Sequence, residues 1–233
     1  MDLALGGFFS ALFLFGLFRW RYAVIAALIL AVFEGALRKW VFPEWGQEIY
    51  FAKDMLLLGA YVSFWGPRFR WRKRLFERHP ANGVIALLSL WAVLQLLNPS
   101  LPNLWVGLFG IKAYLINVPL MYMIPAVFPD EQRLGKFWAA YLILSLIPLT
   151  LGILQFLAPP DSILNQYAWM EDLAPGVAVF GDVPKARVTG TFSYITGYTT
   201  YLVLVSLMCV TLVVSQRVRL LRWGLYGLLG LGL

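Results

Sequence analysis

The chain has 233 residues, of which 61% are hydrophobic and only 13% are charged. A soluble domain is about half apolar and about a quarter charged, so this composition excludes a soluble globular protein and indicates a polytopic membrane protein. The net charge of +7 does not indicate nucleic-acid binding, because the cations gather in short segments between apolar runs. One cysteine and one histidine exclude a disulfide framework and a multi-histidine metal centre, and we predict no metal and no other cofactor.

Seven apolar runs are long enough, or nearly so, to cross a bilayer as helices, since a span needs about 17–25 residues. They lie at 3–18, 22–36, 49–65, 83–97, 105–128, 137–157 and 198–215, and an eighth begins near Trp223. Prolines inside these runs are compatible with helices, because neighbouring helices satisfy the carbonyls that a proline leaves unbonded. The sequence therefore predicts an all-α fold. We expect a single membrane domain over 1–233, a polytopic transmembrane bundle of about 7–8 helices, with one long outward-facing loop at 159–190.

Lysine and arginine are unequally distributed between alternate loops. One set of loops carries 13 of the 19 and the opposite set carries 4. Because cytoplasmic loops carry the excess of Lys and Arg, the bias places the N-terminus outside and the basic segment 67–80 in the cytoplasm. The loop 159–190 then faces outward. The segment 67–80 is best explained as an anchor to anionic lipid head groups, so we expect the phospholipid bilayer as a partner and no nucleic acid.

Charged residues also lie inside or directly beside the apolar runs. They are Glu34, Arg38, Lys39, Lys53, Asp54 and Lys112. An ionisable group at bilayer depth is unfavourable unless it is paired or hydrated, so each is a candidate site residue. Glu34 and Arg38 are four residues apart and can pair on one helix face. A structural ion-pair cluster, with Glu34, Lys53 and Asp54 as members, and a binding role are both open. Lys112 has no acidic neighbour in sequence, and we expect it to face the protein interior or an outward cavity; the alternative is snorkelling to the outer interface.

The stretch 185–201 joins the outward loop to the next apolar run. It begins with Lys185 and Arg187, and nine of the thirteen residues from 189 to 201 are Ser, Thr or Tyr. Hydroxyls at a helix start cap backbone N–H groups, and an arginine beside them can hold a phosphate through two parallel hydrogen bonds. A capped helix start and a phosphate site are therefore both open. For the second, the candidate sugar-contacting residues are Thr189, Thr191, Ser193 and Tyr194.

Three motifs carry a resemblance to a known family. They are GILQFLAP at 152–159, where a span ends before the outward loop; ARVTGTFSYITGYTTYLV at 186–203, with Arg-x-x-Gly-x-Phe at the entry to the next span; and EGALRKWVFP with a later Lys-Asp pair, at 34–54. These motifs resemble the O-antigen polymerase and O-antigen ligase family of bacterial membrane glycosyltransferases. In a common form of the family an Asn-Pro follows the Phe, whereas this chain has Ser193-Tyr194-Ile195-Thr196.

The resemblance implies an enzyme of the bacterial inner (cytoplasmic) membrane that takes part in surface polysaccharide assembly. Such an enzyme transfers or polymerises a glycan from an undecaprenyl-diphosphate-linked oligosaccharide at the periplasmic face, and other membrane proteins of polysaccharide assembly are candidate partners. Arg187 matches the family's entry arginine and takes the diphosphate-binding role. Lys185, Arg38, Lys39 and Lys112 are assigned to the same role by location only, and no residue is assigned as the general base.

Two other function classes stay open. One is a transporter or flippase for an anionic or lipid-linked substrate, and the other is a non-catalytic membrane assembly subunit. A transporter is expected to show paired broken helices or polar residues at the bilayer midplane, whereas the cations here concentrate near the outer edge. Ligase-type members of the family also carry a second outer loop with an arginine and a histidine. Because this chain has no such loop, we expect it to be the N-terminal portion of a longer protein.

Overall fold

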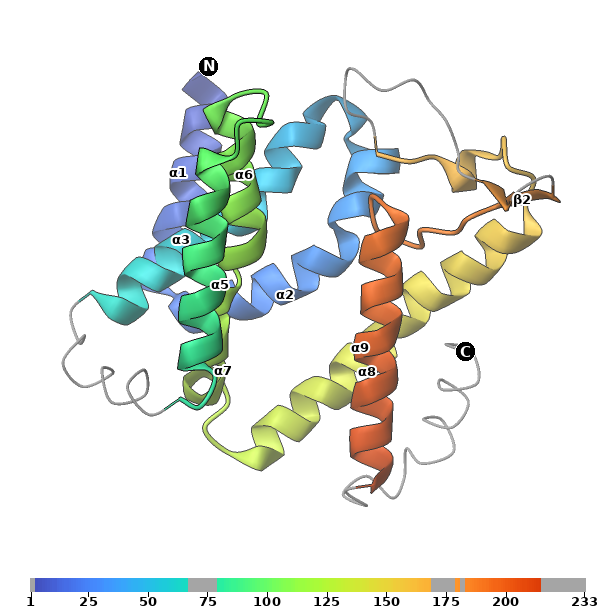
Figure 1. The fold of residues 1–233 in the computed structure, drawn as a ribbon. Helices are drawn as coiled ribbons and strands as arrows, with labels where there is room; N and C mark the ends of the chain where they lie inside the picture. The colour runs from blue at the N-terminus through green and yellow to red at the C-terminus, as the bar shows by residue number, and fades with distance from the viewer. Residues whose placement is uncertain (1–2, 67–78, 169–178, 181–182, 215–233) are drawn as a thin grey trace. The chain divides into compact units, whose positions relative to one another are not determined.

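The computed structural model describes residues 3–66, 79–168, 179–180 and 183–214. These residues are almost entirely helical (Figure 1), which confirms the predicted all-α fold. Four helical stretches among them are long and apolar enough to cross a membrane: Trp20–Val41, Leu104–Val127, Glu131–Leu157 and Ile195–Val214. Two shorter apolar helices cover Ala4–Phe18 and Asn82–Leu97. The predicted span that begins near Trp223 and most of the basic segment 67–80 lie outside the described residues.

The chain forms two compact units, and two helices run from one into the other. The first unit comprises Met1–Ala26 and Asp54–Pro129, and the second comprises Ala27–Lys53 and Asp130–Leu233. Helix α2 (Trp20–Ala36) begins in the first unit, and helix α3 (Gly46–Trp65) ends in it. The functional residues of each unit can therefore be described within that unit. The prediction of a single membrane domain stays a prediction.

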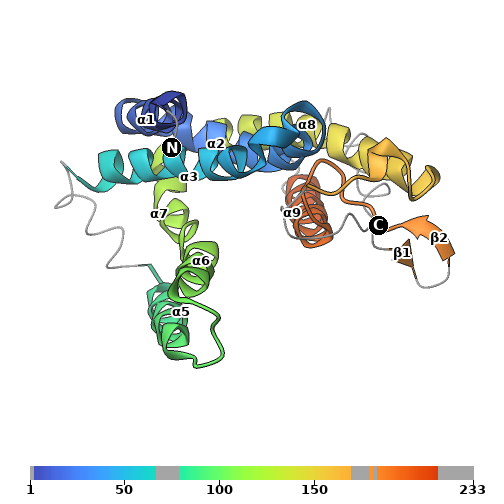
Figure 2. The same ribbon diagram turned by 90° about the horizontal axis from the view of Figure 1, so that it is seen from above.

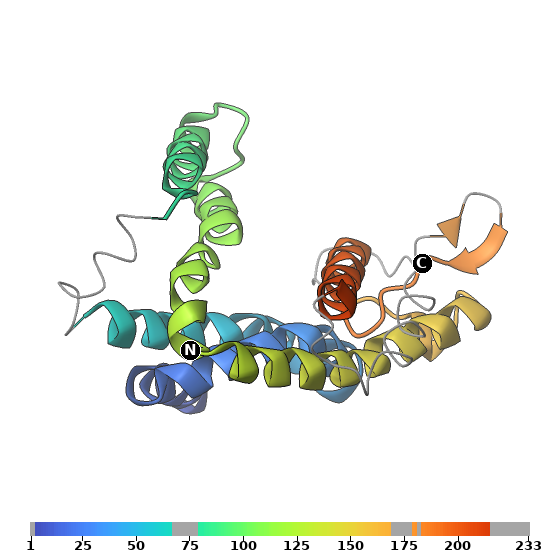
Figure 3. The same cartoon turned by 90° about the horizontal axis from the view of Figure 1, so that it is seen from below.

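The first unit contains α1 (Leu3–Phe18), α5 (Asn82–Leu94), the 3₁₀ turn η3 (Gln95–Leu97), α6 (Leu104–Leu115) and α7 (Val118–Val127). Helices α5 and α6 lie side by side, as Figures 2 and 3 both show. Helix α1 packs closely on α3 through two glycines. A Cβ on Gly59 would lie 2.1 Å from the carbonyl oxygen of Phe13, and one on Gly16 would lie 2.4 Å from that of Leu56. Small residues of this kind let membrane helices approach backbone to backbone.

The predicted span at 105–128 is interrupted in the structure, because α6 ends at Leu115 and α7 begins at Val118. Pro119 has no amide hydrogen to donate to the carbonyl four residues earlier, so a regular helix cannot continue through this point. The Tyr61 hydroxyl donates a hydrogen bond of 2.6 Å to the carbonyl of Ile116 at the break. A side chain from α3 thus satisfies a backbone oxygen that the interrupted helix leaves exposed.

The second unit is built on α8 (Glu131–Leu157) and α9 (Ile195–Val214), which pack against each other. The Asp130 side chain caps α8 by accepting a 2.7 Å hydrogen bond from the backbone N–H of Arg133. The core contains Val32, Leu142, Leu149, Val205 and Met208, all at most 7% exposed. Between α8 and α9 the chain forms the 3₁₀ turn η4 (Ile163–Asn165) and two short antiparallel strands, β1 (Val179–Phe180) and β2 (Val183–Ala186). Strand β2 lies against α8.

Candidate functional site

Helix α2 does not end at Ala36 but continues as one π-helical turn, η1 (Leu37–Val41), before the 3₁₀ turn η2 (Pro43–Trp45). Within this turn Arg38 and Lys39, adjacent in sequence, are both buried, each with 4% of its surface exposed. Charged side chains are almost never buried to this degree without partners. π-helical turns occur frequently at functional sites. We therefore define the candidate site by the residues that contact Arg38 and Lys39.

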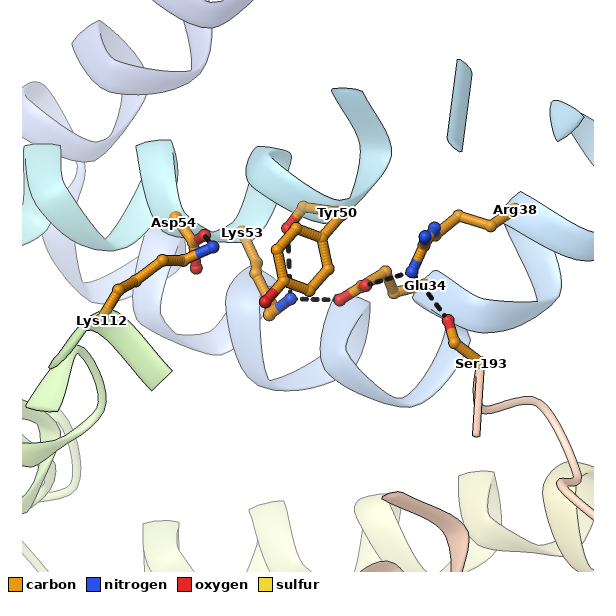
Figure 4. A network of polar contacts seen from close by, with 7 residues as sticks. All are labelled: Glu34, Arg38, Tyr50, Lys53, Asp54, Lys112 and Ser193. Carbon is orange, nitrogen blue, oxygen red and sulfur yellow. Dashed lines mark hydrogen bonds and ion pairs between the residues drawn. The ribbon is translucent and has the colours of Figure 1, made fainter. Parts of the chain in front are cut away.

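Arg38 belongs to a cluster that we call the Glu34 cluster, which consists of Glu34, Arg38, Lys53 and Ser193 (Figure 4). One carboxylate oxygen of Glu34 lies 3.6 Å from Nη1 of Arg38, and the other contacts Nζ of Lys53. Nη1 of Arg38 also donates to the Ser193 hydroxyl over 3.0 Å. The i,i+4 pair predicted from the sequence is therefore present. The cluster holds two cations on one carboxylate and connects α2 to the start of α9.

Lys39 has different partners, and all of them are neutral. Its ammonium donates to the Thr189 hydroxyl over 2.9 Å and to the Gly190 carbonyl over 2.8 Å. It also lies 4.5 Å from the ring centroid of Trp40, a distance at which a cation is attracted to an aromatic face. In the part of the chain that the structure describes, Lys39 forms no ion pair. Among the described residues, this buried ammonium is therefore stabilised by two hydrogen bonds and an aromatic ring and not by an opposite charge.

Gln155, near the end of α8, is fully buried and binds the same backbone turn as Lys39. Its side-chain oxygen accepts hydrogen bonds from the backbone N–H groups of Thr189 and Gly190, at 3.1 and 2.8 Å. Its amide nitrogen donates to the carbonyl of Leu164 over 2.6 Å. Gly190 has a φ of +52°, and a Cβ added to it would lie 2.6 Å from the ring of Tyr198, so only glycine is suited to this position.

The turn that Lys39 and Gln155 hold belongs to a stretch that we call the entry segment, residues 185–193. Its hydroxyls are largely used inside the protein. Thr191 is buried and donates to the carbonyl of Val32 over 2.5 Å, while Thr189 is buried and accepts from Lys39. Ser193 is half-buried and bonded to Arg38, whereas the Tyr194 side chain is 39% exposed. Of the four residues predicted to contact sugar, Thr189, Thr191 and Ser193 are therefore hydrogen-bonded within the protein, and Tyr194 is exposed.

The two cations at the start of the entry segment lie nearer to the surface. Lys185, on β2, is half-buried, with its ammonium 5.5 Å from the ring centroid of Phe156 near the end of α8. Arg187 is exposed, and its backbone carbonyl accepts a 3.0 Å hydrogen bond from the Tyr167 hydroxyl. The structure thus separates the predicted phosphate-binding residues by depth. Lys185 is half-buried and Arg187 is exposed, whereas Arg38 and Lys39 are buried and bonded to Ser193 and to Thr189 and Gly190.

Lys112, the fifth residue assigned to phosphate binding, belongs to the first unit. Its ammonium lies 2.5 Å from a carboxylate oxygen of Asp54, which is 2% exposed (Figure 4), and 5.5 Å from the ring centroid of Phe109. Lys112 therefore faces the protein interior, as predicted. Its partner is 58 positions away in the sequence, so no local pattern indicated it. Within the described residues, no three His, Cys, Asp or Glu side chains group in a way that could hold a metal ion.

Comparison with known proteins found no relative of this chain. No protein-family model, no curated protein and no solved structure matches the chain. The functional assignment therefore depends on the site itself.

The sequence did not lead us to assign a role to Gln155, although this residue lies in the motif at 152–159. A glutamine within an otherwise apolar span was the signal, because a buried amide requires several hydrogen-bond partners.

Proposed function

We propose that this protein acts in bacterial surface-polysaccharide assembly as a glycan polymerase or ligase of the inner membrane. In this role it binds an undecaprenyl-diphosphate-linked oligosaccharide at the periplasmic side and transfers the glycan to an acceptor. The diphosphate is bound by Arg187, assisted by Lys185. The resemblance of the 152–159 and 186–203 motifs to the O-antigen polymerase and ligase family supports this assignment, and the arrangement of the entry segment is compatible with it.

The observation that carries the proposal is the contrast between the accessible cations and the fixed backbone behind them. Arg187 is exposed, and two residues later the chain is held by Lys39 and Gln155. Arginine binds phosphate with a planar fork of N–H groups, and a fixed backbone allows that fork to be aimed. A surface arginine on an unconstrained loop would not favour a diphosphate site in the same way. The location, between the end of α8 and the start of α9, suits a lipid head group whose tail lies in the bilayer.

The chemistry that we propose needs positive charge at the leaving group. The bond between the anomeric carbon of the sugar and the diphosphate oxygen breaks, and the acceptor hydroxyl oxygen forms the new bond to that carbon. The hydroxyl proton passes to a base, and the released undecaprenyl diphosphate carries the additional negative charge. Arg187 and Lys185 stabilise this charge as it develops, which lowers the barrier more than it stabilises the bound substrate.

The test is glycan transfer by the complete protein in membranes that contain a lipid-linked oligosaccharide donor. We expect Arg187→Ala to lower transfer by about 100-fold, the usual effect of removing one electrostatic group from a transition state. Arg187→Lys keeps the charge but not the fork, so it is expected to impair transfer as well. The control is Arg19→Ala, which removes an exposed arginine from the predicted cytoplasmic side. Normal transfer by Arg187→Ala, or a loss explained by a lower amount of protein, would contradict the proposal.

One observation favours a second candidate, a transporter or flippase for an anionic or lipid-linked substrate. The buried Asp54–Lys112 pair lies in the same unit as the interruption between α6 and α7. Interrupted spans beside charged residues form the substrate sites of many transporters. Vesicles reconstituted with the protein distinguish the two functions. A transporter moves labelled lipid-linked glycan across the bilayer with the glycan–diphosphate bond intact, whereas the enzyme releases undecaprenyl diphosphate.

A further inference from the structure

We propose that Gln155 is a positioning residue for the diphosphate site: it holds the backbone turn at Thr189–Gly190 and thereby determines how Arg187 is presented. This inference rests on the proposed function. Gln155 is fully buried and makes no contact with solvent, so it does not bind the substrate itself. Its effect on binding must pass through the entry segment.

The contacts of Gln155 form a clamp on a single turn of backbone. One oxygen accepts the consecutive N–H groups of Thr189 and Gly190, at 3.1 and 2.8 Å. Consecutive N–H groups that converge on one point form a concave site that in many proteins holds an anion. Here the neutral amide oxygen of Gln155 occupies that point. The turn is therefore locked by the protein itself, and the anion must bind elsewhere on the segment.

The other half of the amide ties the same turn to the loop after α8. The Gln155 nitrogen donates to the carbonyl of Leu164 over 2.6 Å and to that of Gly190 over 3.3 Å. The backbone carbonyl of Gln155 in turn accepts a 3.1 Å hydrogen bond from the side chain of Asn165. Both ends of the outward loop are thus fastened to one residue of α8. Methionine has nearly the same length as glutamine but offers none of these hydrogen bonds.

Few residues separate the backbone that Gln155 binds from Arg187. Arg187 precedes Thr189 by two residues, and its own carbonyl is held by the Tyr167 hydroxyl. When the Thr189 and Gly190 N–H groups are released from Gln155, the backbone torsions between Arg187 and Gly190 become free to change. The guanidinium then samples many directions, and a bidentate contact that requires one direction is weakened.

The experiment uses the full chain in lipid nanodiscs, with two independent measurements. Hydrogen exchange reports whether Thr189 and Gly190 are held, and calorimetric titration with farnesyl diphosphate reports the affinity of the diphosphate site. Inorganic diphosphate, titrated in parallel, shows how much of the affinity comes from the lipid part. The variants are Gln155→Met, Arg187→Ala and the combination of the two. Gln95→Met is the matched control, because Gln95 is an exposed glutamine in η3.

We expect Gln155→Met to raise the exchange rates of the Thr189 and Gly190 amides by about tenfold, as for the loss of one hydrogen bond, with α9 unchanged. Its affinity for farnesyl diphosphate should fall about tenfold, the effect typical of removing a group that orients a binding residue. The double variant should bind no more weakly than Arg187→Ala alone, because Gln155 acts through Arg187. Gln95→Met should match the wild type. If Gln155→Met does not accumulate, Gln155→Leu carries the same test, since it also removes the oxygen that accepts from Thr189 and Gly190 and the nitrogen that donates to Leu164.

The outcomes separate the two proposals. Unchanged exchange in Gln155→Met, or affinity losses that add to those of Arg187→Ala, would overturn the positioning role while the proposed function stands. A wild-type protein that binds neither farnesyl diphosphate nor inorganic diphosphate would overturn the proposed function and the positioning role together. Weakened binding that depends on Arg187, with faster exchange confined to the entry segment, supports both.

Discussion

Gly35, near the end of α2, allows a close approach between that helix and the entry segment. A Cβ added to Gly35 would lie 2.2 Å from the backbone nitrogen of Ser193, 2.3 Å from the carbonyl carbon of Phe192 and 2.5 Å from the carbonyl oxygen of Thr191. All three atoms are backbone, so no side-chain rotation can relieve the contact. Gly35→Ala must therefore move the entry segment away from α2 by about 1 Å, since ordinary contacts begin near 3.4 Å.

Overpacking of this kind lowers the free energy of unfolding by about 1–3 kcal/mol. Alanine in a helix recovers about 0.5–1 kcal/mol relative to glycine, so the net loss is expected to be about 1–2 kcal/mol. Gly135→Ala is the matched control, because Gly135 lies in α8 and its Cβ would meet no atom within 4 Å. Apparent melting temperature in detergent micelles measures both. Gly35→Ala should melt several degrees below the wild type, at about 2–4 °C per kcal/mol, and Gly135→Ala at or above it. If both variants were equally stable, the close contact at Gly35 would be refuted.

Three further predictions concern charge. Glu34→Gln leaves the buried Arg38 and the half-buried Lys53 without their carboxylate and should lower the free energy of unfolding by about 3 kcal/mol, measured by denaturant titration in micelles. An unchanged value would mean that the cluster is hydrated. Asp54→Asn and Lys112→Met should each lower the free energy of unfolding in the same assay. The double variant should have a value closer to that of the wild type, and additive losses would contradict a direct pair. Reporter fusions at Arg74 should be cytoplasmic and those at Glu171 external, although both positions lie outside the described residues; reporters on one side would refute the topology.

The local features of the fold could be predicted from the sequence, because they depend on neighbours along the chain. The apolar run at 3–18 corresponds to α1, and the run at 22–36 lies within α2. The pair between Glu34 and Arg38 follows from the 3.6-residue period of a helix. Even the interruption at 116–117 has a local cause in Pro119, although the length of the apolar run concealed it.

Composition and hydropathy thus determined that the chain is a membrane protein of helices, and where most of them lie. Which polar groups meet was decided only by the tertiary structure. Lys39 and Thr189 are 150 positions apart, and Gln155 and Gly190 are 35 apart. The physical reason is that a buried polar group must find a partner but accepts any suitable donor or acceptor, so the requirement is visible in the sequence and the partner is not. Packing of α2, α8 and α9 selects the partner, and in this protein it assigns Lys39 and Gln155 to hold the backbone turn that follows Arg187.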